Sequence, residues 1–338
     1  MVEDVLVIYN DVDKELLSKK NPWQESNTSV LVEVNIVTAA LEKLGIDYNV
    51  VSIGQIKQLP DVLRHNNQKV VFNLVEELPD NILDACYVPA ICSAHGRTCT
   101  GGDTPGLLLS QNKWKTKAVL MAANIPCPQG VLVPIGQKIS STDLTPGRYI
   151  VKPVFSDASE GIDTSSIVEL PSQALHKAIE RVHVEYEQPA IVEQFIPQRE
   201  LNGAVLQLNS KVEVLPIAEI DFTAFEADRP KIVDYDAKWR ADSFAYNNTP
   251  PIIPAQLSAP VAQLVCRCAL AAWYEIGCRD YARVDFRMDD NDNVFVLEVN
   301  LNPDISPDAG FAAALVAGGI TFEEFIDILI NNALSRLR

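Results

Sequence analysis

Residues 282–304 read ARVDFRMDDNDNVFVLEVNLNPD, and this stretch is the most informative about the fold. Two runs rich in β-branched and aromatic residues flank a short polar segment, a pattern typical of a β-hairpin. If the turn is centred between residues 291 and 292, strand pairing sets two pairs directly opposite each other: Asp285 with Glu298, and Arg283 with Asn300. Opposed carboxylates repel, so the pattern predicts a positive charge between them, which a divalent cation would supply.

The alternative is that both carboxylates are ordinary solvated residues on an exposed face. Leu297 and Val299 flank Glu298, however, and favour partial burial, which makes an unpaired carboxylate costly. The turn is not an EF-hand loop, because the sixth position counted from Asp289 is not glycine. We therefore favour a metal site over a solvated pair.

Length and composition limit the class of protein. The chain has 338 residues, 47% of them hydrophobic, and a formal net charge of -17. These values predict a globular protein of two or three lobes. The acidic balance argues against nucleic acid and anionic membranes as partners, because both bind basic surfaces. The longest weakly polar stretch, AGFAAALVAGGITF at 309–322, is too short to span a bilayer.

The N-terminal sequence MVEDVLVIYNDVDKE has acidic residues where a signal peptide needs basic ones, so no secretion is expected. Seven scattered cysteines without a CxxC pair are typical of reduced thiols. The four histidines show no metal-binding spacing. Together these features predict a cytoplasmic protein.

The first third of the chain alternates strands and helices, which is the pattern of a parallel α/β layer. The expected elements are strands at 5–9, 48–53 and 69–75, and a helix over 32–45 that ends at Gly45. Residues 11–28 predict a long polar loop, of a kind that is often functional or mobile.

The remainder predicts two further lobes. A helix over 112–124 leads to a strand at 148–155. The later expected elements are strands at 189–196, 200–208 and 211–220, a polar excursion over 222–254, a helix over 258–277, the hairpin and a helix after Thr321. We expect three units, with bounds 1–105, 106–196 and 197–338.

Several motifs could carry chemistry. Lys152 lies within the apolar strand YIVKPV, where an ammonium group must reach an edge or meet an anion. The next segment, FSDASEG at 155–161, has small residues whose backbone amides could cover phosphates. Glu193 and Glu200 lie in VEQFIPQRE, a connection suited to a nucleotide's base and sugar. Each feature alone has an ordinary alternative, a lysine that reaches solvent or a surface connection. Neither a Walker A sequence nor GxGxxG occurs, which argues against a P-loop or Rossmann site.

In their order and spacing, these motifs resemble those of the ATP-grasp ligases, within them the D-alanine–D-alanine ligase branch. Residues 98–130 are similar to the segment entering the family's central lobe, IVKP to its phosphate-binding strand, VEQF with RE to its hinge, and ARVDF with LEVN to its metal hairpin. The resemblance implies an α/β fold with α+β lobes: an N-terminal parallel α/β layer domain followed by an ATP-grasp fold. ATP would bind between the central and C-terminal lobes.

The resemblance also implies roles for individual residues. The residues implied for ATP are Lys113, Lys152 and Lys238 at the phosphates, Glu193 and Phe195 at the adenine, Glu200 at the ribose, and Leu297 near the base. Those implied for two Mg²⁺ ions, with Mn²⁺ as an alternative, are Asp285, Glu298 and Asn300. Those implied for catalysis are Arg283, which would stabilise an oxyanion, together with Lys238 and Ser159.

In the family's reaction a carboxylate attacks the γ-phosphorus of ATP, an acyl phosphate forms, and an amine displaces phosphate. Closure of segment 155–161 and of the loop around Lys238 would keep water from that intermediate. The implied partners are small molecules, an amino acid and a carboxylate or carbonyl acceptor. By analogy with the family, a homodimer is also implied.

The substrate end departs from the family's pattern. Residues 9–27 lack its glycine-rich segment, so no single acid takes the place of its substrate-binding glutamate. The family's loop serine aligns with Ala158, and its tyrosine after the loop lysine is Trp239. Its proline-glycine turn becomes NLNPDISPDAGF, in which Asp304 or Asp308 would repel a substrate carboxylate or favour an amine.

We therefore expect D-alanine to be a poor substrate. One candidate is a ligase that joins a small amino acid to a mycosporine ring, where an enaminone carbonyl oxygen would be phosphorylated. The alternatives are a D-alanine–D-alanine ligase, an L-amino-acid dipeptide ligase and a non-catalytic nucleotide-binding module. Retention of Arg283 argues against the last, and a two-lobed ligand-binding protein would be expected to carry a secretory signal.

Overall fold

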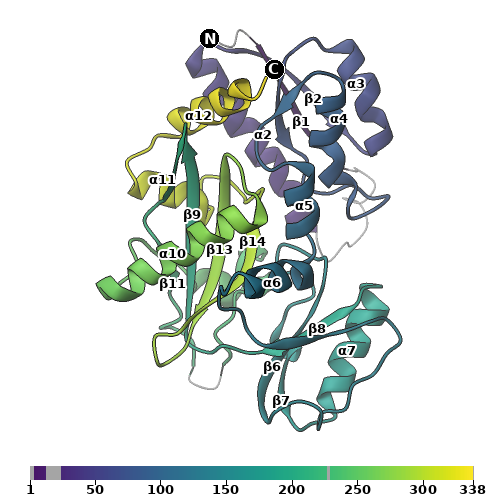
Figure 1. The fold of residues 1–338 in the computed structure, drawn as a ribbon, viewed down its shortest axis with the longest axis vertical. Helices are drawn as coiled ribbons and strands as arrows, with labels where there is room; N and C mark the ends of the chain where they lie inside the picture. The colour runs from purple at the N-terminus through teal and green to yellow at the C-terminus, as the bar shows by residue number, and fades with distance from the viewer. Residues whose placement is uncertain (1–3, 13–23, 227–228, 338) are drawn as a thin grey trace.

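The computed structural model describes residues 4–12, 24–226 and 229–337, which form three β-sheets (Figure 1). The first sheet is parallel, in the order β2-β1-β3-β4. Its strands are β1 (Asp4–Asn10), β2 (Asp47–Ile53), β3 (Val70–Leu74) and β4 (Thr98–Cys99). The helices in this part are α2 (Gln24–Leu44), α3 (Leu59–His65) and α4 (Val88–Ala94). The predicted parallel α/β layer is thus confirmed.

The long loop predicted for residues 11–28 is partly wrong. Helix α2 begins at Gln24, so the last five of those residues are helical, and residues 13–23 lie outside the described residues. The helix ends as expected at Gly45, whose φ of 68° is accessible to glycine at no steric cost.

The second sheet is antiparallel, in the order β5-β8-β6-β7. Its strands are β5 (Gly130–Val133), β6 (Gly147–Pro153), β7 (Ile167–Leu170) and β8 (Ala190–Gln194). Helix α7 (Ala174–Glu185) covers one face, because four buried apolar side chains follow helical spacing: Leu175, Ala178, Ile179 and Val182.

The third sheet has six strands, in the order β12-β11-β9-β13-β14, with β10 paired to β9. They are β9 (Arg199–Leu208), β10 (Lys211–Val214), β11 (Ala218–Ile220), β12 (Pro251–Ile252), β13 (Tyr281–Met288) and β14 (Val294–Asn300). The single strand expected at 211–220 is therefore two strands. The break contains Pro216, which has no N–H to donate to a sheet.

Predicted helix ends agree with their capping residues. Helix α6 (Lys113–Ala122) starts after Asn112, whose side chain accepts a hydrogen bond from the Lys115 N–H. Helix α10 (Ala259–Ile276) ends at Gly277, and α12 (Phe322–Ser335) starts with a capping box. Sequence patterns missed seven helices of the described residues. Three are α3, α4 and α7, and the others are α5 (Thr104–Ser110), α8 (Tyr235–Trp239), α9 (Phe244–Asn247) and α11 (Gly310–Ala317).

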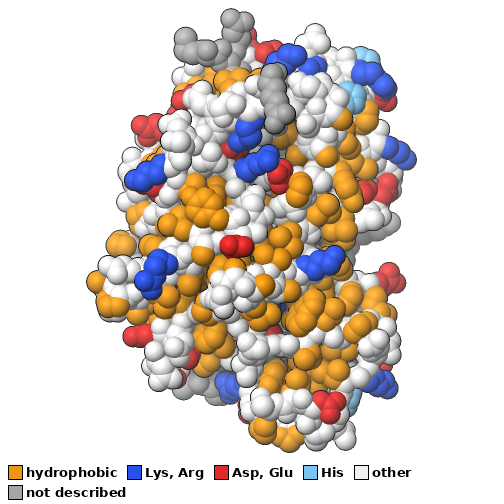
Figure 2. Space-filling model, viewed as in Figure 1, with side chains coloured by type: hydrophobic (Ala, Val, Ile, Leu, Met, Phe, Trp, Pro, Cys, Tyr) orange, Lys and Arg blue, Asp and Glu red, His pale blue; other side chains and the backbone are white. Residues whose placement is uncertain are grey.

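None of the described helices is both long and apolar enough to cross a membrane. All seven cysteines carry free thiols, as predicted. On the face shown in Figure 2, basic side chains are scattered among acidic and apolar ones, so the described residues form no continuous basic area there.

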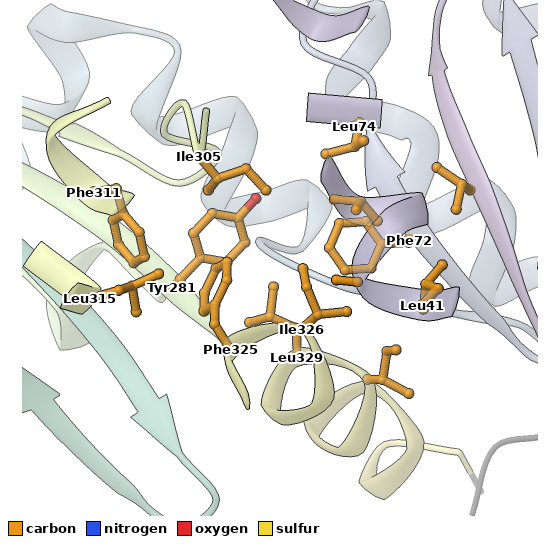
Figure 3. Packing of buried hydrophobic residues seen from close by; sticks show 14 of the residues in the cluster. Leu41, Phe72, Leu74, Tyr281, Ile305, Phe311, Leu315, Phe325, Ile326 and Leu329 are labelled. Carbon is orange, nitrogen blue, oxygen red and sulfur yellow. The ribbon is translucent and has the colours of Figure 1, made fainter. Parts of the chain in front are cut away.

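A single apolar cluster joins the first sheet to the third. The rings of Tyr281, Phe311 and Phe325 pack edge-on or tilted with centroids 5.5 Å apart. Figure 3 shows Ile326 and Leu329 of α12 between these rings and Phe72 of β3. The C-terminal helix therefore fastens the first sheet to β13, the strand that carries Arg283 and Asp285.

A buried ion pair reinforces this junction. The Asp280 side chain is 0% exposed and accepts hydrogen bonds from Arg336 Nη1 at 2.6 Å and Nη2 at 2.8 Å. Its Oδ2 also accepts from the Gly101 N–H at 2.7 Å, and Arg336 donates to the Cys99 carbonyl oxygen. These bonds tie the C-terminal end to β4 and to the start of β13.

We expect Arg336→Ala to lower the free energy of unfolding by about 3 kcal/mol, because it leaves the Asp280 carboxylate buried without its counter-charge. Urea unfolding would measure the loss. The control is Lys211→Ala, which removes an exposed ion pair with Glu213 and should change stability by less than about 0.5 kcal/mol. Equal effects of the two substitutions would contradict the role given to Asp280.

Candidate functional site

The hairpin of β13 and β14 has the predicted register where the charged residues lie. Arg283 is opposite Asn300, and Asp285 is opposite Glu298. Toward the turn the register shifts by one, so that Phe286 pairs with Val296 and Leu297 has no partner. The fully symmetric pairing expected from the sequence is therefore wrong beyond Asp285, and Leu297 forms a β-bulge.

The bulge explains how β14 can present both core and site residues. Val294 and Val296 are buried in the core, and Val299, three residues after Val296, is buried there too. In a regular strand the side chains alternate between the two faces, so residues three apart would face opposite sides. The extra residue at Leu297 returns Val299 to the core face. As a result Glu298 and Asn300 line a cavity on the other face.

The two opposed carboxylates lie on either side of one amide. Asn300 Nδ2 donates to Asp285 Oδ2 at 3.1 Å and to Glu298 Oε1 at 3.3 Å. Arg283 donates to both oxygens of Asp285, at 2.7 and 2.9 Å, and Asn202 adds a third bond at 2.8 Å. The positive charge that the sequence demanded is thus partly supplied by the protein itself.

Four cationic groups surround Glu298. Burial alone would raise the pKa of Glu298, but Lys113, Lys238, Lys152 and Arg283 outweigh it and hold the pKa well below its usual range. Of these four groups, Lys113 forms an ion pair with Glu298, and its Nζ lies 3.7 Å from Glu298 Oε2. Glu298 is therefore ionised across the physiological range.

The oxygen donors suit a hard cation. Two carboxylates and an amide oxygen match the ligands of Mg²⁺, which commonly takes one or two carboxylates and completes its shell with water and phosphate oxygens. Within the ranges the structure describes, no three His, Cys, Asp or Glu side chains gather as a metal site. Asp285, Glu298 and Asn300 thus fit an ion shared with a phosphate-bearing ligand.

A second buried charge group lies beside the hairpin. Glu193 is 1% exposed, and its two oxygens face Lys152 Nζ at 2.5 Å and Lys117 Nζ at 3.0 Å. Burial would raise the pKa of Glu193, but Lys117 and Lys152 outweigh it and lower the pKa below 4.5. Burial, helped by Lys117, also lowers the pKa of Lys152. Two ammonium groups sharing one carboxylate leave a net positive charge that an anion would balance.

Sequence analysis missed Lys117, although a signal for it exists. It follows Lys113 by four residues and so lies on the same face of α6, and both side chains are buried. Two buried lysines on one helical face would have indicated an anion site more strongly than either alone.

The segment after β6 is bonded to the loop that carries α8. Trp239 Nε1 donates to the Ala158 carbonyl oxygen at 3.0 Å, and Ser159 Oγ donates to the Val233 carbonyl oxygen at 2.9 Å. Lys113 Nζ donates to the Ser156 carbonyl oxygen. Ala158 lines the cavity, whereas the Ser159 hydroxyl is engaged with Val233, so the structure does not bring Ser159 together with the other predicted residues.

Of the residues expected near a nucleotide's base and sugar, Phe195 and Glu200 lie near Arg287, whereas Glu193 is paired with Lys117 and Lys152. Glu200 Oε2 lies 3.4 Å from Arg287 Nε, and the Arg287 guanidinium lies 5.4 Å from the centre of the Phe195 ring. Burial raises the pKa of Glu200, against the opposing effect of Arg287. Leu297 is half-buried in the bulge of β14. Arg287, which is buried, was not predicted as part of this group.

A cavity of about 170 Å³ opens where the three sheets meet. The predicted residues that line it are Ala158, Lys238, Trp239, Arg283, Glu298, Asn300 and Asp304. Of the two aspartates predicted to face the substrate, Asp304 lines the cavity, whereas Asp308 is exposed and does not. Among the residues that the structure describes, six carboxylates and two cationic side chains line it, and the acids include Glu76 and Glu77, which sequence analysis missed. Their position directly after buried strand β3 was a usable signal, because ligands bind beyond the carboxyl ends of parallel strands.

Comparison with known proteins gives a consistent result. A family model described as D-ala D-ala ligase C-terminus matches residues 143–331. An uncharacterized protein of Sinorhizobium fredii, y4sG, is 31% identical over 82% of this chain and 78% of its own. The D-alanine–D-alanine ligase of Gluconobacter oxydans is 26% identical over 90% of this chain and 94% of its own.

Among solved structures, the D-alanine–D-alanine ligase of Bacillus anthracis complexed with ATP superposes with a TM-score of 0.75. The two share 18% sequence identity, and the match covers 99% of this chain and 98% of the other. This likeness in architecture confirms the predicted fold.

We expect Glu193→Gln to destabilise the protein by about 3 kcal/mol at neutral pH, because it strands two buried ammonium groups. The lowered pKa means that the carboxylate's contribution is complete above pH 4.5 and is lost as pH falls through the folded-state value. Thermal unfolding at pH 7 and pH 3 would show the difference from wild type shrinking in acid.

The matched control is Glu169→Gln, which breaks an exposed pair with Arg148 and should change stability by less than about 0.5 kcal/mol at either pH. A constant difference for Glu193→Gln from pH 7 to pH 3 would show that the ion pairs do not stabilise the fold.

Proposed function

Because the chain belongs to the D-alanine–D-alanine ligase family of ATP-grasp enzymes, which are ATP-dependent carbon–nitrogen ligases, we propose that it couples a carboxylate to an amine in this cavity. The observation that carries the proposal is the set of four cations around Glu298. Glu298 and the neighbouring Asp285 form a pair of carboxylates suited to Mg²⁺. Such a site fits a triphosphate better than any uncharged ligand.

The charged residues divide naturally between the parts of ATP. Lys113, Lys152 and Lys238 would contact the phosphates, with Lys117 completing the positive charge around Glu193. Phe195 after β8, Glu200 of β9, Arg287 of β13 and Leu297 of β14 would hold the base and ribose. Asp285, Glu298 and Asn300 would hold Mg²⁺, which when bound neutralises phosphate oxygens.

The reaction then proceeds in two steps. A substrate carboxylate oxygen attacks the γ-phosphorus, ADP leaves with the electron pair of the broken bond, and an acyl phosphate results. A free amine attacks the acyl carbon, the C–O bond to phosphate breaks, and the amine loses a proton as the amide forms. Lys113, Lys152, Lys238 and Arg283 would stabilise the negative charge that moves through these steps.

Water must be kept from the acyl phosphate. The bonds from Trp239 to Ala158 and from Ser159 to Val233 join two segments across the cavity, which supports a role for them as its cover. In this reading Ser159 positions the cover and does not contact the reacting atoms.

Narrower forms of the proposal differ in which two substrates are joined. The names of relatives favour D-alanine as both substrates. The acidic lining argues against it, because Glu76, Glu77 and Asp304 would repel a second substrate's carboxylate. A mycosporine-type enaminone is a further candidate, supported by Ala158 and Trp239 at the cavity wall, where this sequence departs from the family's serine and tyrosine.

The test is a phosphate-release screen with ATP, Mg²⁺ and pairwise mixtures of D-alanine, L-amino acids, amines and enaminone acceptors, with mass spectrometry of each product. We expect release that requires both substrates and gives an amide product, or an imine product with an enaminone acceptor. D-Alanine alone should turn over more slowly than the best pair. If D-alanine alone is the best substrate, the chain is a D-alanine–D-alanine ligase, and if no pair releases phosphate, the proposal fails.

We expect Glu298→Gln to lower turnover by about a hundredfold or more, because it removes transition-state charge stabilisation worth several kcal/mol. The fold should persist, since Glu298 lies at the cavity and not in the apolar core. Steady-state phosphate release at increasing Mg²⁺ measures the effect. The control, Asp290→Asn in the exposed turn of the same hairpin, should keep turnover within about twofold.

A further inference from the structure

We propose that the amino-acid substrate carries an apolar side chain larger than a methyl group, and that this side chain binds one wall of the cavity. This apolar wall consists of five cavity-lining residues: Val75, Ile82, Ala85, Cys86 and Leu107. The inference rests on the proposed function and gives it a substrate class, amino acids such as norvaline, norleucine or leucine rather than alanine.

The apolar wall comes from two neighbouring parts of the chain. Val75 directly follows β3, and the next three members lie in or shortly before the 3-10 helix η2 (Asp84–Tyr87). Leu107 belongs to α5, which packs against η2. The wall is therefore one continuous surface, built by the segment after β3 together with α5.

Ile82 supplies the observation that points to a ligand. It is 38% exposed although it lines the cavity, whereas Ala85 and Cys86 beside it are 5% and 4% exposed. A single exposed isoleucine is ordinary on an open surface, but here it continues an apolar lining inside a cavity. A ligand group that removes this side chain from water would gain free energy by the hydrophobic effect.

The apolar wall is held in place from behind. Val75 and Ala85 belong to an apolar core of the first sheet, so they cannot move into the cavity to fill it. Leu107 is positioned by α5, whose capping residue Asp103 accepts a hydrogen bond from the Gly106 N–H at 3.0 Å. A rigid wall of this kind can select a substrate side chain by size.

The segment after β6 lies close to this wall. Burial raises the pKa of Cys86 to about 11, and the negative charge of Asp157 adds to the effect. The thiol is thus neutral at physiological pH and behaves as a small apolar group. Phe155 and Trp239 also line the cavity. A substrate side chain on the wall would therefore have further apolar groups near it when these segments cover the site.

ATP does not account for the apolar wall. Phe195, Glu200 and Leu297, which we propose for the base and ribose, do not line this cavity. The triphosphate is charged and would bind at the cations around Glu298. An apolar substrate group remains as the occupant. An amino acid suits both parts of the cavity, because its charged groups could lie near Arg283 while its side chain lies on the wall.

Binding to the full chain tests the proposal without turnover. Isothermal titration would compare alanine, 2-aminobutyrate, norvaline and norleucine, each as both enantiomers, with and without Mg²⁺ and a non-hydrolysable ATP analogue. Burial of one methylene is worth about fourfold in affinity, so we expect an increase of at least about tenfold from alanine to norleucine for the enantiomer that binds. A flat series, or no binding of any member under either condition, would overturn the proposal.

A polar isostere separates burial from size. O-Methylhomoserine has the length of norleucine but carries an ether oxygen in place of one methylene. This oxygen would lose water at the apolar wall, so we expect O-methylhomoserine to bind at least about threefold more weakly than norleucine. Equal affinities would show that the side chain remains in water, and the wall would then not be its binding site.

Variants then locate the substrate side chain. Ile82→Asn should weaken binding of norleucine at least about fivefold and leave alanine within about twofold. Leu107→Ala is a second variant should the first fail to fold, and it should show the same selective loss. The matched control is Ile135→Asn, at a 54% exposed isoleucine after β5 that does not line the cavity, and it should bind like wild type. Unchanged dependence on chain length in both cavity variants would refute the assignment.

In the phosphate-release assay, kcat/KM should follow the same order as affinity. Affinity that rises with chain length without any phosphate release would contradict the proposed ligation and leave the apolar wall standing as a binding site. Ligation of alanine as efficiently as norleucine would contradict the role of the wall and leave the ligation standing.

Discussion

The site depends on one electrostatic constraint, the enforced proximity of Asp285 and Glu298 across the hairpin. Two carboxylates at opposed positions would push the strands apart unless positive charge lies near them. Here Arg283 clasps Asp285, Lys113 lies near Glu298, and the Asn300 amide donates to both. The protein thereby holds the two carboxylates close together, the condition under which a divalent ion and a polyphosphate can be bound together.

This constraint explains why the rest of the fold must be held firmly. The hairpin belongs to the third sheet, whereas its cations come from α6 and β6, and its cavity is also lined by Asn10 at the end of β1 and by the segment after β3. A shift of the first sheet would separate Glu76 from Asp304. The aromatic cluster at Tyr281, with the Asp280–Arg336 pair beside it, ties that sheet to the strand bearing Arg283. Core packing therefore sets the geometry of the site as well as the stability of the chain.

Much of this arrangement could be predicted from local patterns, because strand alternation, helix caps and the opposed charges are short-range features of the sequence. The Asp285–Glu298 register and the ends of α6, α10 and α12 are examples. The bulge at Leu297 could not be predicted, because it depends on Val296 and Val299 both packing into the core. The different surroundings of Asp304 and Asp308, and the bond from Ser159 to Val233, likewise follow only from tertiary packing.

Among the described residues, acids outnumber basic side chains in the cavity lining, and this has a consequence for a chain with a net charge of -17. A polyanion such as ATP is repelled by the protein as a whole, so its binding depends on a local group of cations around Glu298 and Glu193. The acids that line the cavity after β3 and β14, Glu76, Glu77 and Asp304, offer no positive charge to a phosphate. An anionic ligand is therefore expected to bind at the lysines and Arg283 and not beside these acids. A carboxylate drawn to the same cations would lie near the phosphates, which is the alignment that phosphoryl transfer requires.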